Sequence, residues 1–204
     1  MWIDFNQTLL KYNIKPKGLI HIGAHYGTEY NIYKQSNIEN CIFFEPLIKN
    51  FKVLKEHVGD KVQCYNLALG NKICDIEMYV ENSNQSRSCS VLRPKHHLNQ
   101  YPSIYFNERE MVKMNRLDDI DFVKSNYNII VIDVQGYELE VFKGASKFLN
   151  NVDLIISEIN IEEMYENCVL VNDLNNYLLT YNFELVEKHC PHNTWGDGIY
   201  IKKQ

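Results

Sequence analysis

The sequence predicts an α/β fold built on an open, mostly parallel sheet with helices on both faces. Two features of the 204-residue chain lead to this fold class. Short apolar runs rich in β-branched and aromatic residues recur along it, which is typical of parallel strands buried on both faces. Segments with apolar residues at helical spacing lie between most of these runs. The last two runs have no helix between them, so we expect an antiparallel hairpin at one edge.

The first part of the chain alternates between predicted helices and strands. Asp4 can cap a first helix within an N-terminal helical extension of residues 1–17. Pro46 ends an apolar strand, whereas residues 73–80 alternate polar and apolar side chains, which predicts an added strand with one exposed face. The expected elements are a helix over 4–12, a strand over 19–22, a helix over 26–35, a strand over 41–46, a helix over 47–58, and strands over 62–69 and 73–80.

The second part begins with a long irregular segment rich in Ser, Asn, Arg and His. Such segments in a compact domain are usually functional or mobile, so residues 82–109 are a candidate flap over a substrate. A solvated loop is the alternative. The elements expected after it are an added strand over 110–117, a very apolar strand over 128–134, a helix over 137–149, a strand over 152–159, a helix over 170–181, and strands over 183–187 and 198–202.

Composition excludes several classes of protein. The net charge of -5 leaves no basic field to hold nucleic acid or an anionic membrane. No apolar run reaches the roughly 18 residues of a membrane span, and the first residues do not resemble a signal peptide. The six cysteines form no C-x-x-C pair, which indicates free thiols in a reducing compartment. We therefore expect one cytoplasmic domain over residues 1–204, without nucleic-acid or membrane partners.

The carboxyl ends of the predicted strands carry the chemistry. In an open α/β sheet, ligands bind beyond these ends, near the point where the strand order reverses. Residues 23–27 form a glycine turn there, and Glu45, Asp133 and Glu158 end three other strands. The turn lacks the G-x-G-x-x-G pattern of dinucleotide-binding folds, because His25 and Thr28 occupy two of the required glycine positions. A ligand site and a simple strand–helix turn both fit it.

Glu45 favours a nucleoside ligand. It lies about 20 residues after the glycine turn, where an acidic side chain accepts hydrogen bonds from the hydroxyl groups of an adenosine ribose. An exposed carboxylate at a strand end is the alternative.

One segment resembles a known family. The run Asp133–Ala145, DVQGYELEVFKGA, is similar to the signature of the FkbM-type S-adenosylmethionine-dependent methyltransferases. The resemblance covers about residues 18–202, with further similar segments at 19–27, 44–46, 66–70, 88–90, 115–119, 157–160 and 195–202.

The resemblance implies a Rossmann-like class I methyltransferase fold, S-adenosylmethionine as cofactor, and transfer of a methyl group to an oxygen of a sugar or other small metabolite. Methyltransferases of this kind often have an acidic residue where this chain has His21, so the ammonium group of the cofactor needs another partner. The residues that we expect at the cofactor are His21, Gly23, Ala24 and Gly27 around its methionine part, Glu45 and Pro46 at the ribose, Asn66, Ala68 and Leu69 at the adenine, and Ser90 and Asp133.

Asp133 is the expected general base. A carboxylate within hydrogen-bond distance of a hydroxyl group can take its proton as the methyl group is transferred. Asp133 ends the most apolar strand, and we expect partial burial there to suit it to this role. A contact with the cofactor alone is the alternative.

Glu158 and His192 complete the candidate catalytic set. Glu158 could orient the acceptor, share a divalent ion with Asp133, or cap the following helix. We do not favour a metal, and Pro191 excludes a helical zinc motif around His192. Tyr137, Trp195 and Asp197 are the residues that we expect at the acceptor, since an aromatic ring can stack on the apolar face of a sugar. An ordinary polar turn is the alternative for the segment that holds Trp195.

The sequence therefore predicts an S-adenosylmethionine-dependent O-methyltransferase that acts on a sugar or glycan, for example a deoxyhexose such as rhamnose. A methyltransferase of a non-sugar metabolite and a non-catalytic cofactor-binding module are the alternatives. The chain could also be one domain of a larger enzyme that builds glycans.

Overall fold

The strands predicted as buried form one seven-stranded sheet. A computed structural model describes residues 3–203, so Met1, Trp2 and Gln204, at the ends of the predicted domain, lie outside the described residues. The strand order is β3-β2-β1-β7-β8-β10-β9. The strands are β1 (Leu19–Ile22), β2 (Cys41–Phe44), β3 (Gln63–Tyr65), β7 (Ile129–Ile132), β8 (Leu154–Asn160), β9 (Phe183–His189) and β10 (Trp195–Lys202).

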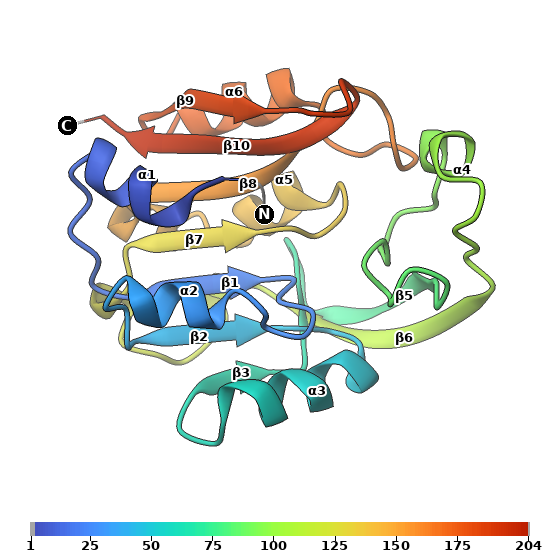
Figure 1. The fold of residues 1–204 in the computed structure, drawn as a ribbon, viewed down its shortest axis with the longest axis horizontal. Helices are drawn as coiled ribbons and strands as arrows, with labels where there is room; N and C mark the ends of the chain where they lie inside the picture. The colour runs from blue at the N-terminus through green and yellow to red at the C-terminus, as the bar shows by residue number, and fades with distance from the viewer. Residues whose placement is uncertain (1–2, 204) are drawn as a thin grey trace.

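Helices cover both faces of this sheet (Figure 1). On one face, α5 and α6 pack on strand residues such as Ile20, Ile42 and Ile130. On the other face, α1, α2 and α3 pack on residues such as Leu19 and Phe43. These bounds are α1 (Phe5–Lys11), α2 (Tyr30–Gln35), α3 (Ile48–Val58), α5 (Glu138–Lys143) and α6 (Val171–Leu179).

The strand directions agree with the prediction. Strands β3, β2, β1, β7 and β8 run parallel, and their carboxyl ends share one edge of the sheet. Strand β10 pairs antiparallel with both β8 and β9, so the last two strands form the expected hairpin at one edge. In Figure 1 the arrows of β1, β2 and β7 point toward β5, β6 and α4.

A second, three-stranded sheet stands at that end, in the order β4-β6-β5. It contains β4 (Ala68–Leu69), β5 (Cys74–Val80) and β6 (Glu108–Asn115). The predicted single strand over 62–69 was wrong, because the chain leaves the main sheet after β3 and pairs with β6 instead. Strand β5 buries Met78 and Val80 and exposes Asp75 and Glu77, as its alternation predicted.

Two helices are shorter than expected. Helix α2 begins at Tyr30, because residues 23–29 form the turn after β1. Helix α5 ends at Lys143, and Gly144 packs so closely on Gly70 that a Cβ atom would lie 1.9 Å from the Gly70 carbonyl oxygen. A short 3₁₀ helix (Phe148–Asn151) follows, and two others lie at Leu117–Asp119 and Lys124–Asn126.

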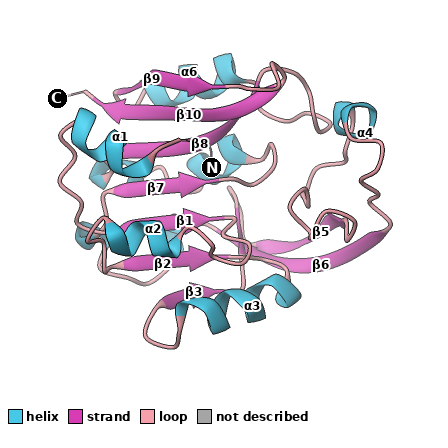
Figure 2. Cartoon of the chain, viewed as in Figure 1, coloured by secondary structure: helices cyan, strands magenta, loops and turns pink. Residues whose placement is uncertain are grey.

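The segment between β5 and β6 is mostly loop, with one short helix, α4 (His96–Gln100) (Figure 2). Among the helices of residues 3–203, none has the length and apolar character that crossing a bilayer requires.

Candidate functional site

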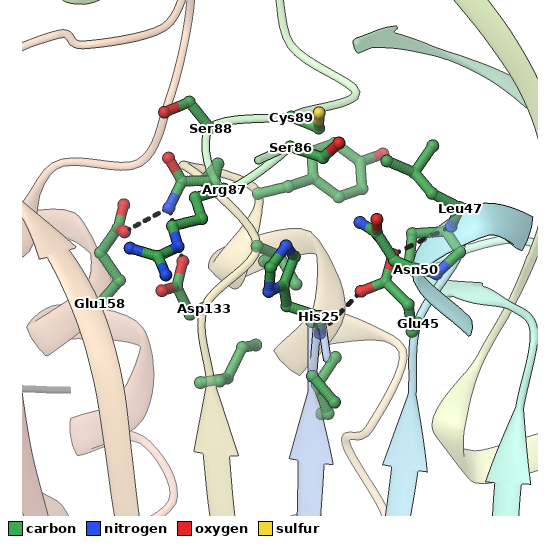
Figure 3. A pocket seen from close by; sticks show the side chains of 18 of the residues that line it. His25, Glu45, Leu47, Asn50, Ser86, Arg87, Ser88, Cys89, Asp133 and Glu158 are labelled. Atoms are coloured by element: carbon green, nitrogen blue, oxygen red, sulfur yellow. Dashed lines mark hydrogen bonds between the residues drawn. The ribbon is translucent and has the colours of Figure 1, made fainter. Parts of the chain in front are cut away.

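A cavity of about 710 Å³ lies at the carboxyl ends of the parallel strands. Gly23, Glu45, Asp133 and Glu158 all line it, as the sequence predicted for residues at those ends. Figure 3 shows Glu45 and Glu158 at opposite ends of this cavity, with Asp133 and His25 between them. The cavity therefore has a Glu45 end, formed by the ends of β1 and β2 and by β4, and a Glu158 end, formed by β8 and β10. The β5–β6 loop reaches both ends.

The glycine turn allows the close packing of β1 on β7. Gly23 has a φ of +77°, and a Cβ atom there would lie 1.9 Å from the carbonyl oxygen of Asp133. Its backbone N–H and that of Ala24 both donate to the carbonyl oxygen of Phe44, at 3.0 and 2.9 Å. A side chain at position 23 would push these strand ends apart, so the shape of the cavity depends on this glycine.

The carboxylate of Glu45 is held by backbone groups. Its Oε2 accepts from the N–H of His25 at 2.8 Å, and its Oε1 accepts from the N–H of Leu47 at 3.0 Å. The Asn50 amide lies 3.4 Å from Oε1, and the Asn50 Oδ1 is buried without a partner among the described groups. Burial raises the pKa of Glu45 to about 7, against the effect of these N–H groups.

Most predicted site residues line the cavity. They are His21, Gly23, Ala24, Glu45, Pro46, Ala68, Leu69, Asp133, Tyr137, Glu158, His192, Trp195 and Asp197.

Three predicted residues, Gly27, Asn66 and Ser90, do not line it. Gly27 packs against helix α3, where a Cβ atom would lie 2.5 Å from Leu54. Asn66 donates to the carbonyl oxygens of Glu45 and Pro46, at 2.9 and 2.7 Å. The Ser90 hydroxyl donates to a backbone carbonyl, that of Gln135, at 2.8 Å. Each of these three residues supports a wall of the cavity without lining its interior.

His21 is buried and neutral. Its Nδ1 lies 3.1 Å from the Tyr33 hydroxyl, and burial lowers its pKa. Glu29 is an acidic residue near His21 that also lines the cavity and is half-buried. Glu29 follows the glycine turn in sequence, but no pattern marks it as facing the ligand.

Asp133 and Glu158 form a carboxylate pair with unequal surroundings. Glu158 is 3% exposed. Burial, together with the charge of Asp133, raises the pKa of Glu158 well above its ordinary value. Asp133 is exposed within the open cavity, so the partial burial predicted for it was wrong. The physical reason is that β7 ends at Ile132, so Asp133 lies on the turn beyond the buried strand.

Gln135 joins the two carboxylates, and the sequence assigned it no role. Its Nε2 donates to Asp133 Oδ1 at 2.6 Å and to Glu158 Oε2 at 2.7 Å. Its Oε1 accepts from the Tyr165 hydroxyl at 2.7 Å. Gln135 has a φ of +55°, a conformation that side-chain-bearing residues rarely adopt. Backbone strain of this kind is found at functional sites, and no pattern in the sequence reveals it.

Residues of the segment 82–109, the candidate flap, line the cavity. Glu81 shapes the first part of this segment, because this buried carboxylate accepts from the N–H groups of Asn84 and Ser88. The His25 ring lies 2.7 Å from the carbonyl oxygen of Gln85, which joins the flap to the glycine turn. Flap residues that line the cavity include Asn84, Ser86, Arg87, Ser88, Cys89, Val91, His97, Tyr101 and Ile104.

Aromatic side chains line the Glu158 end. The rings of His192 and Trp195 stack with centroids 5.5 Å apart and planes at 17°. The Trp195 Nε1 donates to the Tyr101 hydroxyl at 2.9 Å, which connects the start of β10 to the flap. Asp197 lies opposite Glu158 in the β8–β10 pair. Across residues 3–203, no group of three or more His, Cys, Asp or Glu side chains is placed to hold a metal ion.

Comparisons with known proteins agree with this geometry. A sequence model described as the methyltransferase FkbM domain matches residues 21–185. The 2-O-methyltransferase NoeI of Sinorhizobium fredii is 26% identical in an alignment of 191 residues, and the match covers 89% of this chain and 77% of that protein.

Solved structures show the same fold. Magnesium protoporphyrin IX methyltransferase from Synechocystis, with bound S-adenosylmethionine, matches with a TM-score of 0.55 and 9% identity, over 97% of this chain and 76% of that one. Ribosomal protein L11 methylase from Lactobacillus delbrueckii subsp. bulgaricus matches with a TM-score of 0.57 and 10% identity, over 97% and 76%. The Rossmann-like class I methyltransferase fold that the resemblance implied is confirmed.

Proposed function

Because this chain belongs to the FkbM methyltransferase family and is a methyltransferase that uses S-adenosylmethionine, we propose that its acceptor is a hydroxyl group of a sugar or glycan. The observation that carries the proposal is the two-ended cavity. One end holds a backbone-bound carboxylate suited to a ribose, and the other holds a carboxylate pair beside an aromatic wall. The similarity to a 2-O-methyltransferase supports an oxygen acceptor. A deoxyhexose such as rhamnose is our narrower proposal.

The Glu45 end fits the cofactor. The carboxylate oxygens of Glu45 each accept one backbone N–H and keep further acceptor capacity for ribose hydroxyl groups. The unpartnered Oδ1 of Asn50 supplies another acceptor at the same place. We assign Gly23 and Ala24 to the methionine part and Glu29 to its ammonium group, in place of an acidic residue at position 21. We assign Ala68 and Leu69, which also line the cavity, to the adenine.

The bound cofactor supplies a methyl group on a positively charged sulfur, which is an activated donor. The protein supplies position and proton transfer. The walls of the cavity would hold the acceptor hydroxyl group and the methyl donor in reactive positions, which removes much of the entropic barrier. The Asp133 carboxylate takes the hydroxyl proton at this point, a step that typically contributes about 10²–10⁴-fold.

The carboxylate pair keeps Asp133 available for this proton. Burial and the charge of Asp133 raise the pKa of Glu158 well above its ordinary value, so the carboxyl group of Glu158 is the one that holds a proton. Gln135 donates one hydrogen bond to each carboxylate and so fixes the distance between them. We assign Asp133 as general base, Glu158 as the proton-holding partner that orients the acceptor, and His192 as a further group beside it.

The test is product analysis. The full chain, incubated with methyl-labelled cofactor and a panel of nucleotide sugars, methyl glycosides, short glycans and non-sugar alcohols, should form O-methyl products from the sugars. Mass spectrometry with fragmentation identifies the methylated oxygen. Products formed only from non-sugar alcohols would exclude the sugar acceptor, and cofactor binding without any product would favour a non-catalytic module.

A further inference from the structure

Two buried side chains at the Glu158 end have polar atoms with no partner. Asn160 is 1% exposed, and both its Nδ2 and its Oδ1 lack a hydrogen-bonding group in the part of the chain that the structure describes. His97 is 4% exposed, and its Nδ1 is unpartnered in the same sense. Both residues line the cavity. Because buried polar atoms are nearly always hydrogen-bonded in native proteins, three such atoms on residues that line one cavity point to a ligand.

The position of Asn160 follows from the strand geometry. Asn160 stands two residues after Glu158 on β8, so the two side chains project from the same face. In the antiparallel pair with β10, Glu158 lies opposite Asp197, and Asn160 lies opposite Trp195. Directly opposed residues share a face of the sheet. These four side chains therefore form one surface, in which the Asn160 amide lies next to the carboxylate pair and beside the aromatic wall.

His97 completes this end from the flap. Its ring packs against Tyr101, Phe106 and Tyr165, with centroids 5.0, 5.2 and 5.5 Å away. Its backbone N–H donates to the carbonyl oxygen of Met164 at 3.1 Å, which anchors the first turn of α4. Burial lowers the pKa of His97 to about 4, so the ring is neutral at pH 7. These contacts hold the ring in place, so the Nδ1 atom is a fixed, uncharged polar group of the cavity lining.

The chemistry of these atoms defines what they recognise. The Asn160 amide presents a donor and an acceptor side by side, which matches two neighbouring hydroxyl groups. The neutral His97 Nδ1 matches one more hydroxyl or ring oxygen. The stacked His192 and Trp195 rings supply a flat apolar surface beside them. A ring that carries several hydroxyl groups meets all three conditions, whereas a simple alcohol or an apolar ring leaves the buried amide unpaired.

We propose that Asn160 and His97 form the acceptor subsite, which binds a pyranose ring through two neighbouring hydroxyl groups on the Asn160 amide and a further oxygen on His97. This assignment rests on the proposed sugar function and names the residues that select the acceptor. Neither side chain reacts. They determine which hydroxyl group lies against Asp133.

The test compares three variants of the full chain. Asn160→Leu keeps the branched shape of the side chain, His97→Phe keeps an aromatic ring, and both remove the polar atoms. Asn50→Leu is the matched control, because Asn50 is also a buried asparagine of this cavity with an unpartnered oxygen, but at the Glu45 end. Each variant is measured for the acceptor KM, kcat, and the Kd of S-adenosylhomocysteine. Saturation-transfer NMR with methyl α-L-rhamnopyranoside and methyl β-D-glucopyranoside follows acceptor binding without turnover, and cyclohexanemethanol is the apolar control ligand.

Asn160→Leu and His97→Phe should each raise the acceptor KM by about 10–100-fold and weaken the pyranoside NMR signals, with the cofactor Kd within about twofold of wild type. Asn50→Leu should instead raise the cofactor Kd and leave the acceptor KM near the wild-type value. Removing an unpartnered amide should leave the Tm of Asn160→Leu equal to or above that of wild type. Should Asn160→Leu fold poorly, Asn160→Ala and His97→Phe give the same readouts.

Wild-type pyranoside methylation with an unchanged acceptor KM in both variants would overturn the subsite and leave the proposed function standing. A wild type that binds S-adenosylhomocysteine but neither binds nor methylates any pyranoside would remove the sugar function, and this inference with it.

Discussion

The two ends of the cavity hold their carboxylates in different ways. Glu45 accepts hydrogen bonds from the backbone N–H groups of His25 and Leu47, which belong to the turns after β1 and β2. Glu158 accepts its hydrogen bond from the side chain of Gln135, which itself depends on Tyr165. The Glu45 end is therefore set by backbone geometry, while the Glu158 end is set by side chains that can change without changing the fold. This difference suits a constant cofactor and a variable acceptor.

The largest effect should come from the centre of the cavity. Asp133→Asn removes the proposed base but keeps a side chain that can bond to Gln135, so turnover should fall by about 10²–10⁴-fold. Single-turnover methyl transfer measures this directly. The Kd of S-adenosylhomocysteine, from calorimetry, should change by less than about threefold. Full turnover in the variant would assign the base to another group, with Glu158 and His192 as the next to replace.

The second-largest effect should come from a substitution at the Glu45 end. Glu45→Gln places an NH₂ group against the N–H of His25 or Leu47 and removes the charge, so the cofactor Kd should rise by about 10–100-fold. At saturating cofactor, kcat and the acceptor KM should stay near the wild-type values. Asn160→Leu is expected to do the opposite, raising the acceptor KM and leaving the cofactor Kd nearly unchanged. If Glu45→Gln changed the acceptor KM instead, the division of the cavity into two ends would be wrong.

Glu45 also predicts a pH dependence. Burial raises its pKa to about 7 in the free protein, and the ionised form is the one that accepts the ribose hydroxyl groups. Below about pH 7 the carboxyl group must lose a proton before the cofactor binds, so wild-type affinity should fall by up to about tenfold per pH unit. The Gln variant should lack this dependence. A wild-type cofactor Kd that is constant between pH 5.5 and 8 would contradict this pH dependence.

The sequence could predict that Gly23 and Glu45 lie at the Glu45 end, for a physical reason. Gly23 and Glu45 lie directly after strands that apolar runs reveal, and their roles depend on backbone positions that a parallel sheet fixes. Asp133 was placed correctly but its burial was not, because the end of β7 could not be located to one residue.

The Glu158 end brings together the flap, the turn after β7, and strands β8 and β10. Gln135, Asn160 and His97 come from three of these segments, and no spacing in the sequence shows that they meet. The split of the predicted strand 62–69 has a similar origin. Pairing of β4 with β6, more than 40 residues away, overrides the local apolar pattern. Contacts between distant segments therefore account for most of what the sequence did not show.

The smallest effect concerns stability and tests whether the cavity carries unfavourable charge. Burial raises the pKa of Glu45 and of Glu138 to about 7, and that of Glu158 well above its ordinary value. Between their unfolded values and these raised values, the folded state binds more protons than the unfolded state. The free energy of unfolding must then fall as pH rises through this window. The buried histidines have lowered pKa values and act in the opposite direction, but only below about pH 6.5.

Above about pH 6.5 the histidines no longer act, and the free energy of unfolding without ligand should still fall as pH rises, measured by urea denaturation. Glu158→Gln should make the free energy of unfolding less dependent on pH. Asp119→Asn, which changes an exposed ion pair, should not. Saturating S-adenosylmethionine should also reduce this pH dependence, because the positive charge of the cofactor favours the ionised carboxylates that destabilise the free protein. A stability that rises with pH in this window would mean that the carboxyl groups are paired in the free protein, and the contrast between the two ends would then rest on geometry alone.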